Sequence, residues 1–158
     1  MDMDFERIVR TYGDSLYRIA VHYTANTRDA QDIVQQTFLK LVENRKNFES
    51  EEHEKAWLIR VCINLCKDNL KSSWHSKVSY IQERDFSAPI YEIDEKMPLL
   101  SYVKKLPRNQ KAAIYLFYYE DMSVFQIAEV MNARQNTVLS WLNRGRKALK
   151  KILNEEGL

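Results

Sequence analysis

Apolar residues recur three and four positions apart along most of the chain, which is the repeat expected of α-helices with one buried side. In the first half, this pattern predicts helices at residues 4–24 and 28–44. A third predicted helix follows the polar segment 44–52 and ends near Ser73; it is apolar on most sides, which is typical of a helix at the centre of a bundle.

The second half repeats the helical pattern over shorter segments. It predicts a helix at about 99–105, ended by Leu106-Pro107, and another at 108–119. Pro107 suits the first position of that second helix, because proline has no N–H to leave unsatisfied there. The side chains expected to be buried in it are Ala113, Ile114, Leu116 and Phe117.

Residues 75–96 lose the helical pattern, carry Pro89 and are net acidic. We interpret them as a flexible linker of about 70 Å when extended, at ~3.3 Å per residue. Gly and Pro number only three each in the 158 residues. The expected fold is therefore all-α, with two small helical domains at 1–74 and 97–158, and the second of these has four helices.

The segment from Ser123 to Lys151 has the outline of a helix-turn-helix, a unit that places its second helix in the major groove of DNA. Ser123 and Gln126 have the spacing of a capping box at the start of the short first helix. Asn132 is a residue type that tolerates the left-handed backbone of a tight turn.

The second helix of this segment divides into an apolar stripe and a basic face. The stripe consists of Val138, Leu142, Gly145, Leu149 and Ile152. The opposite face carries Asn136, Ser140, Asn143, Arg144, Lys147 and Lys151. These are side chains that read bases and neutralise phosphates. An ordinary amphipathic helix with a solvated basic face remains the alternative interpretation of this pattern.

Charge is unevenly distributed along the chain. The net formal charge is −1 for residues 1–74, −2 for 75–96 and +5 for 97–158, so the basic end coincides with the predicted helix-turn-helix. Arg108 and Lys111 lie near the start of their helix, where they would meet phosphate. Nucleic acid is thus the ligand that the charge pattern favours.

Catalytic and metal chemistry have little support in the sequence. Cys62 and Cys66 have no second pair of ligands, and the three histidines are scattered, so we expect two packed thiols, no metal and no cofactor. The absence of a clustered carboxylate or histidine set argues against an enzyme such as a nuclease. The acidic N-terminus is unlike a signal peptide and no apolar run is long enough to span a bilayer, so a cytoplasmic protein without membrane insertion is expected.

Two polar faces in the first half have two possible explanations each. Leu39 lies among polar residues of the helix at 28–44, which indicates either a partner-protein contact or one of the lone exposed leucines that are common on protein surfaces. The next helix carries a stripe of Arg60, Asn64, Lys67 and Lys71, which suits single-stranded nucleic acid or is simply solvated.

Four segments together resemble the extracytoplasmic-function (group IV) sigma factors of bacterial RNA polymerase, members of the sigma-70 family. DAQDIVQQTF resembles the family's D-A-E-D-x-x-Q-x-T-F segment, and AWLIRVCINLCKDNLK resembles W-L-x-R-I-A-x-N-x-x-x-D-x-x-R. LPRNQKAAIYLFYYEDMSVFQIAEVMN is similar to the stretch that opens the family's second domain, and NTVLSWLNRGRKALK to its recognition helix. The segments occur in the family's order, with a linker between the second and the third.

The resemblance implies a sigma region 2 domain at 1–74 and a sigma region 4 domain at 97–158. It implies binding to core RNA polymerase, at the clamp helices of the largest subunit through Asp29, Asp32, Gln35, Gln36 and Leu39, and a further contact with the flap region. It implies recognition and melting of the promoter −10 element through Asn47, Phe48, Arg60, Asn64, Lys67 and Lys71. It implies recognition of the −35 element through Arg108, Lys111, Arg134, Gln135, Asn136, Thr137, Ser140, Arg144 and Lys147. An anti-sigma factor is a further implied partner.

Three positions depart from the family pattern. Leu139 and Trp141 stand where the family commonly has basic residues, and Lys71 stands near a usual arginine. Leu139 offers no hydrogen-bond donor to a guanine or a phosphate, so the −35 preference is not expected to follow that of relatives. The alternative function is a stand-alone helix-turn-helix regulator that binds duplex DNA without polymerase.

Overall fold

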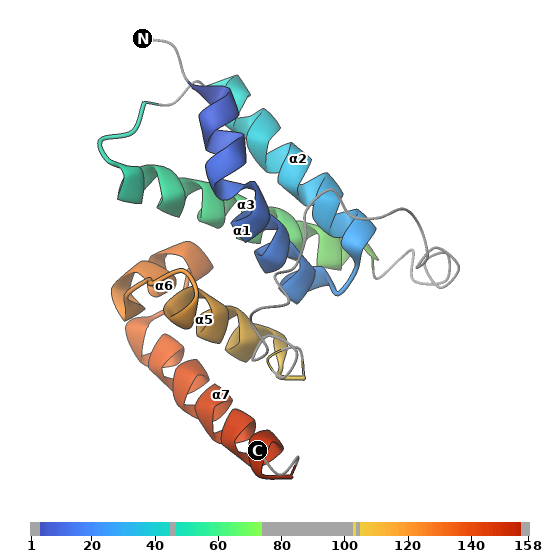
Figure 1. Ribbon diagram of the computed structural model, residues 1–158, viewed down its shortest axis with the longest axis vertical. Helices are drawn as coiled ribbons and strands as arrows, with labels where there is room; N and C mark the ends of the chain where they lie inside the picture. The colour runs from blue at the N-terminus through green and yellow to red at the C-terminus, as the bar shows by residue number, and fades with distance from the viewer. Residues whose placement is uncertain (1–3, 45–46, 74–102, 104, 156–158) are drawn as a thin grey trace. The chain divides into compact units, whose positions relative to one another are not determined.

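The computed structural model describes residues 4–44, 47–73, 103 and 105–155 of the 158-residue chain. These residues fall into two compact units, which divide between Ile93 and Asp94. Each regular element of the described ranges is an α-helix, as the sequence predicts (Figure 1). None of these helices combines the length and the apolar character that crossing a membrane requires.

The first unit is built from α1 (Phe5–Thr24), α2 (Thr27–Asn44) and α3 (Glu51–Ser73), and each of these helices packs against the other two (Figure 1). The start of each helix is capped by a polar side chain, because the first N–H groups of a helix have no partner within it. Asp4 accepts from the N–H of Arg7, and Asn26 accepts from the N–H of Asp29 at 3.0 Å. Ser50 accepts from the N–H of His53 at 3.1 Å.

The core of the first unit is formed by the buried stripes of its helices. On α2, Ala30, Ile33, Val34, Thr37 and Leu41 are all buried at helical spacing, and Phe38 joins them with its ring against that of Phe5. On α3, Leu58, Ile59, Cys62, Ile63 and Cys66 are buried, and the other apolar residues are only half-buried. The two sides of α3 therefore differ more than its composition suggested.

A polar network joins the start of α3 to α1. The carboxylate of Glu54 is buried in the first turn of α3 and accepts two hydrogen bonds from Nη2 of Arg7, at 3.0 and 3.2 Å. The hydroxyl of Tyr12 donates to the same carboxylate at 3.0 Å. Burial, followed by the hydrogen bond with Glu54, raises the pKa of Tyr12 to about 12, so the phenol stays protonated and keeps donating.

The second unit consists of α5 (Arg108–Tyr118), α6 (Val124–Met131) and α7 (Gln135–Glu155). Val138, Leu142, Gly145 and Leu149 form the buried stripe of α7, as predicted. Gly145 permits a close approach of α7 to α5, because a Cβ placed there would lie 2.9 Å from Cγ1 of Ile114. The tight contact explains why this stripe contains a glycine despite its cost in a helix.

The helix-turn-helix of the second unit has the predicted local structure. Ser123 Oγ accepts from the N–H of Gln126 at 3.1 Å, and the Gln126 side chain accepts from the N–H of Ser123 at 2.9 Å, which completes the capping box. Asn132 ends α6 in the left-handed conformation, with φ of 53°. These features place α7 directly after a three-residue turn.

Some predictions differ from the structure or fall outside the described residues. Pro107 is the N-cap of α5 instead of its first helical residue, and Phe117 is half-buried instead of buried. The linker predicted at 75–96 lies outside the described residues, as does most of the helix predicted at 99–105. Within that predicted helix, Val103 is buried, and its carbonyl accepts from the N–H of Leu106 at 3.0 Å.

Candidate polymerase and nucleic-acid interfaces

The exposed face of α2 has an apolar centre within a polar border. Leu39 is 58% exposed and Val42 is 45% exposed, and the spacing of three places them side by side on the helix. The predicted residues Asp32, Gln35 and Gln36 are exposed around them. Val42 was not among the residues predicted for this face, although its spacing of three from Leu39 indicates that it lies on the same side of the helix. We call Leu39, Val42 and these three polar residues the α2 patch.

Asp29 differs from the other residues predicted on this face. It is half-buried in the first turn of α2, and its N–H group is held by the side chain of Asn26. An acidic side chain at this position interacts favourably with the positive end of the helix dipole. The structure therefore gives Asp29 a role in starting α2, at one end of the α2 patch.

An aromatic cluster lies where the segment before α3 meets that helix. The ring centroid of Phe48 lies 5.3 Å from that of His53 and 5.7 Å from that of Trp57. Asn47 is exposed next to Phe48, and Phe48 and Trp57 are half-buried. Part of each of these two rings therefore stays accessible for a further stacking partner.

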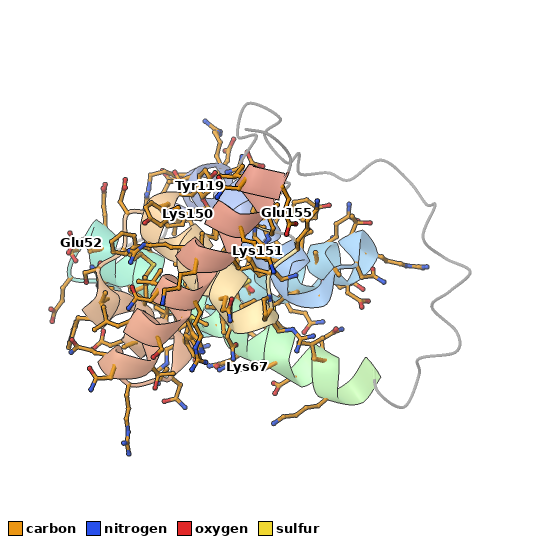
Figure 2. All side chains as sticks on the ribbon, turned by 90° about the horizontal axis from the view of Figure 1, so that it is seen from below. Glu52, Lys67, Tyr119, Lys150, Lys151 and Glu155 are labelled. Carbon is orange, nitrogen blue, oxygen red and sulfur yellow. The ribbon has the colours of Figure 1, made fainter. Side chains whose placement is uncertain are left out.

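The predicted polar stripe of α3 forms one row on the helix. Arg60, Asn64 and Lys71 are exposed and Lys67 is half-buried (Lys67 is labelled in Figure 2). Trp57 continues the row by one further step of three residues. From Arg60 to Lys71 the row extends over about 16 Å at 1.5 Å per residue. The row therefore has an aromatic ring at its N-terminal end and cationic and amide groups after it. This arrangement suits single-stranded DNA, because bases stack on aromatic rings and cations neutralise the phosphates.

The exposed face of α7 has no acidic side chain between Gln135 and Asn154. Most of the residues predicted to read the −35 element are exposed on it or just before it, namely Arg134, Gln135, Asn136, Ser140, Arg144 and Lys147. Thr137 is half-buried at the edge of this face. Lys150 and Lys151 extend the positive charge toward the end of α7 (Figure 2).

The remaining two predicted residues lie on α5. Arg108 is exposed and Lys111 is half-buried in the first turn of that helix. Leu139, at a position where the family usually has a basic residue, is 44% exposed, and Trp141 is half-buried. The half-buried indole agrees with packing of Trp141 beside the apolar stripe of α7.

A short network on the surface of the second unit fixes the side chain of Arg146. Its Nε donates to the Tyr118 hydroxyl at 2.6 Å, and its Nη1 donates to Oδ1 of Asn143 at 3.3 Å. The guanidinium carbon lies 5.5 Å from the ring centroid of Phe117 and 5.6 Å from that of Tyr118. Sequence spacing does not indicate this cluster, because its members lie on two helices.

Beside Arg146, a groove of about 340 Å³ opens between α5 and α7. Its lining residues are Ile114, Tyr118, Arg146, Leu149, Lys150, Leu153 and Asn154. Apolar side chains dominate the lining, with two cationic groups among them. An amphipathic segment with acidic residues at its edges would match this combination.

The two cysteines lie in the core of the first unit. Cys62 donates to the carbonyl of Leu16 at 3.6 Å, and both thiols are fully buried. A hydrogen bond with Cys62, together with burial, raises the pKa of Cys66 far above its usual value. A thiol that stays protonated is a poor nucleophile and a poor metal ligand. Within the described ranges, no group of three or more His, Cys, Asp or Glu residues could hold a metal ion.

Comparison with known families assigns both units. Residues 8–76 match the family model of sigma-70 region 2, and residues 96–149 match that of sigma-70 region 4. The chain belongs to the sigma-70 family. Relatives along nearly the whole chain carry the name of one group of that family, the extracytoplasmic-function sigma factors, and the chain is a sigma factor of this group.

Two relatives from Bacillus subtilis illustrate the match. The chain is 24% identical to the ECF RNA polymerase sigma factor SigW, over 96% of this chain and 89% of that protein. It is also 24% identical to the ECF sigma factor SigM, over 96% of each protein.

A solved structure supports the fold. It is the sigma factor RpoE from Bartonella quintana, crystallised in complex with the anti-sigma factor NepR. RpoE has a TM-score of 0.68 to this chain at 20% identity, over 96% of this chain and 97% of RpoE.

Proposed function

We propose that this sigma factor binds core RNA polymerase and directs promoter-specific transcription initiation by reading the −10 and −35 elements and helping to melt the DNA. In this proposal residues 1–74 hold the polymerase and the −10 strand, 97–158 hold the −35 duplex, and 75–96 link them. The protein contributes binding, and nucleotidyl transfer belongs to the polymerase. The protein acts in the cytoplasm, where the polymerase is.

The α2 patch is the surface that binds the clamp helices of the polymerase largest subunit. An exposed leucine and valine bordered by polar side chains have the composition of a small protein interface, with an apolar centre and a polar rim. The exposure of Leu39 beside Val42 carries the proposal, since docking on the polymerase would remove this apolar surface from water.

The −10 element is bound by the segment before α3 and by the α3 row. Arg60, Lys67 and Lys71 neutralise backbone phosphates of the displaced non-template strand. A base that leaves the stack is read in a pocket formed by Asn47 and Phe48, from the segment before α3, together with Asn64 of α3. The half-buried rings of Phe48 and Trp57 provide stacking energy of about 1–3 kcal/mol per base, which offsets the cost of unstacking.

The −35 element is bound as a duplex by α7. Its first two turns enter the major groove, where Gln135, Asn136 and Ser140 meet base edges and Arg134 and Thr137 lie beside them. Arg144 and Lys147 contact phosphates further along the helix, and Arg108 and Lys111 contact them from the first turn of α5.

Two protein partners are proposed for the rest of the surface. The groove between α5 and α7 receives a segment of the polymerase flap region, because its apolar lining and cationic Arg146 and Lys150 suit an amphipathic acidic segment. An anti-sigma factor holds the protein inactive until a signal releases it. The complex of RpoE with NepR supports this second proposal, since the same fold binds such a partner there.

Transcription in vitro tests the proposal directly. The full chain is added to core RNA polymerase with a library of genomic fragments, and the transcripts are sequenced. We expect transcripts that start at fixed positions downstream of a shared pair of motifs, and none from core polymerase alone. Selective binding of duplex DNA without polymerase, and no promoter-dependent transcript with it, would instead establish the stand-alone regulator.

A further inference from the structure

Three side chains form a row along the first half of α7. Asn136, Leu139 and Asn143 are spaced three and four residues apart, so they are neighbours on the helix surface, and all three are exposed. Successive members lie about 4.5 and 6 Å apart along the axis, at 1.5 Å per residue. Since base pairs are stacked about 3.4 Å apart, the members of the row would meet neighbouring base pairs.

Leu139 is the apolar member of this row. Its side chain is 44% exposed, while Val138 and Leu142 on the same helix already supply the contact with the core. The only apolar group that base pairs present in the major groove is the C5-methyl group of thymine. A base pair that places its thymine methyl group against Leu139 therefore covers the exposed apolar surface of this side chain, whereas a G·C pair offers it no apolar group.

Asn143, the last member of the row, is held in one orientation. Its Oδ1 accepts from Nη1 of Arg146, and Arg146 is itself held by the Tyr118 hydroxyl. The carbonyl end of the Asn143 amide is thereby directed to Arg146, and the NH₂ end remains to donate. That donor matches acceptors such as O4 of thymine or N7 of a purine.

We propose that Leu139 is a specificity-determining residue that selects a thymine in the −35 element through its methyl group, between bases contacted by Asn136 and Asn143. The inference rests on the proposed −35 function of α7. It assigns this protein a −35 preference that a sigma factor with a basic residue at the same position does not share.

Removal of a single methyl group tests the assignment. Duplexes randomised over the −35 region are selected with the full chain bound to core polymerase. Each thymine of the selected sequence is then replaced in turn by deoxyuridine, which lacks only the methyl group. At one position we expect about fourfold weaker binding, which corresponds to the ~0.8 kcal/mol of one buried methyl group.

Three variants complete the test. Leu139→Ala should remove the sensitivity to deoxyuridine at that position, and Leu139→Arg should change the selected base there to guanine. The matched control is Phe125→Ala, which truncates another exposed apolar side chain of the same unit, 55% exposed on α6, and should retain the sensitivity.

The outcomes separate the inference from the function on which it rests. Sequence-selective binding without a methyl effect at any thymine overturns the assignment of Leu139 and leaves the −35 function intact. A methyl effect that persists in Leu139→Ala overturns the assignment as well. A holoenzyme that selects no −35 sequence contradicts the proposed function, and the inference fails with it.

Discussion

The helices proposed to contact DNA, α3 in the first unit and α7 in the second, are held in place by different interactions. The start of α3 is fixed by directional hydrogen bonds, from Arg7 and Tyr12 to the buried carboxylate of Glu54. In contrast, α7 is fixed by close packing, with Gly145 against Ile114. The first arrangement is sensitive to the loss of a polar partner, and the second to a change in volume. Substitutions that separate these two sensitivities test the comparison.

The largest effect is expected where a charge enters an apolar contact. Leu39→Arg should weaken binding to core polymerase by about 100-fold, or ~3 kcal/mol, because the guanidinium would be buried at the centre of the α2 patch without a partner. Titration of labelled protein with core polymerase measures the change. Recognition of −35 DNA by the second unit should stay as in the wild type.

Leu139→Arg is the matched control, since it introduces the same side chain at an exposed leucine of the other unit. It should leave polymerase affinity unchanged and alter only the choice of DNA. Equal polymerase affinity for the Leu39→Arg and wild-type proteins would rule out the clamp assignment.

The second effect concerns the polar network at α3. Glu54→Gln should lower the free energy of unfolding of the first unit by about 2 kcal/mol, because it replaces a charged acceptor of Arg7 and Tyr12 with a neutral amide. Hydrogen exchange of the α1 and α3 amides measures the loss. Glu52→Gln, at an exposed glutamate of the same turn, should change it by less than about 0.5 kcal/mol. Similar losses for both variants would mean that the network does not fix α3.

The third effect concerns the packing of α7. Gly145→Ala adds a methyl group against Ile114, at a cost of about 1–3 kcal/mol, and gains about 1 kcal/mol of helix propensity. We expect a net loss of about 1 kcal/mol, seen as faster exchange of the α5 and α7 amides. Exchange in α1–α3 should not change. A variant more stable than the wild type would show that Ile114 moves aside without cost.

The smallest effect separates two contacts on α7. Arg144→Ala should weaken binding to all duplexes by about threefold and lower the slope of log affinity against log salt by about 1, because one phosphate contact is lost. Ser140→Ala should keep the salt slope and relax the sequence preference. Selection from a randomised duplex library measures both, and an unchanged selectivity profile for Ser140→Ala would remove Ser140 from base reading.

The sequence predicted the features that depend on local spacing. The capping box at Ser123, the left-handed Asn132 and the exposed Leu39 all follow from residue types a few positions apart, and the structure has them. The assignments of individual residues to polymerase or DNA remain predictions, because they concern molecules that bind to the chain.

The features that were missed depend on contacts between helices. Glu54 lies in the first turn of α3, where any carboxylate favours the start of a helix, but its partners Arg7 and Tyr12 lie more than 40 residues away. Phe117 was expected to be buried, but its ring lies beneath the guanidinium of Arg146 at the surface. Helical periodicity identifies the side of a helix that is buried, and it does not identify the partner on another helix.

The two buried thiols of α3 are a natural probe for opening of the first unit. Cys62 and Cys66 are its only cysteines, and neither lies in the second unit. Because both thiols are fully enclosed, they react with an alkylating reagent only after the surrounding helices separate. The rate of alkylation therefore counts openings of the N-terminal bundle alone. Compared between the free protein and its complex with polymerase, that rate measures how far docking holds the bundle closed, with no label or substitution introduced.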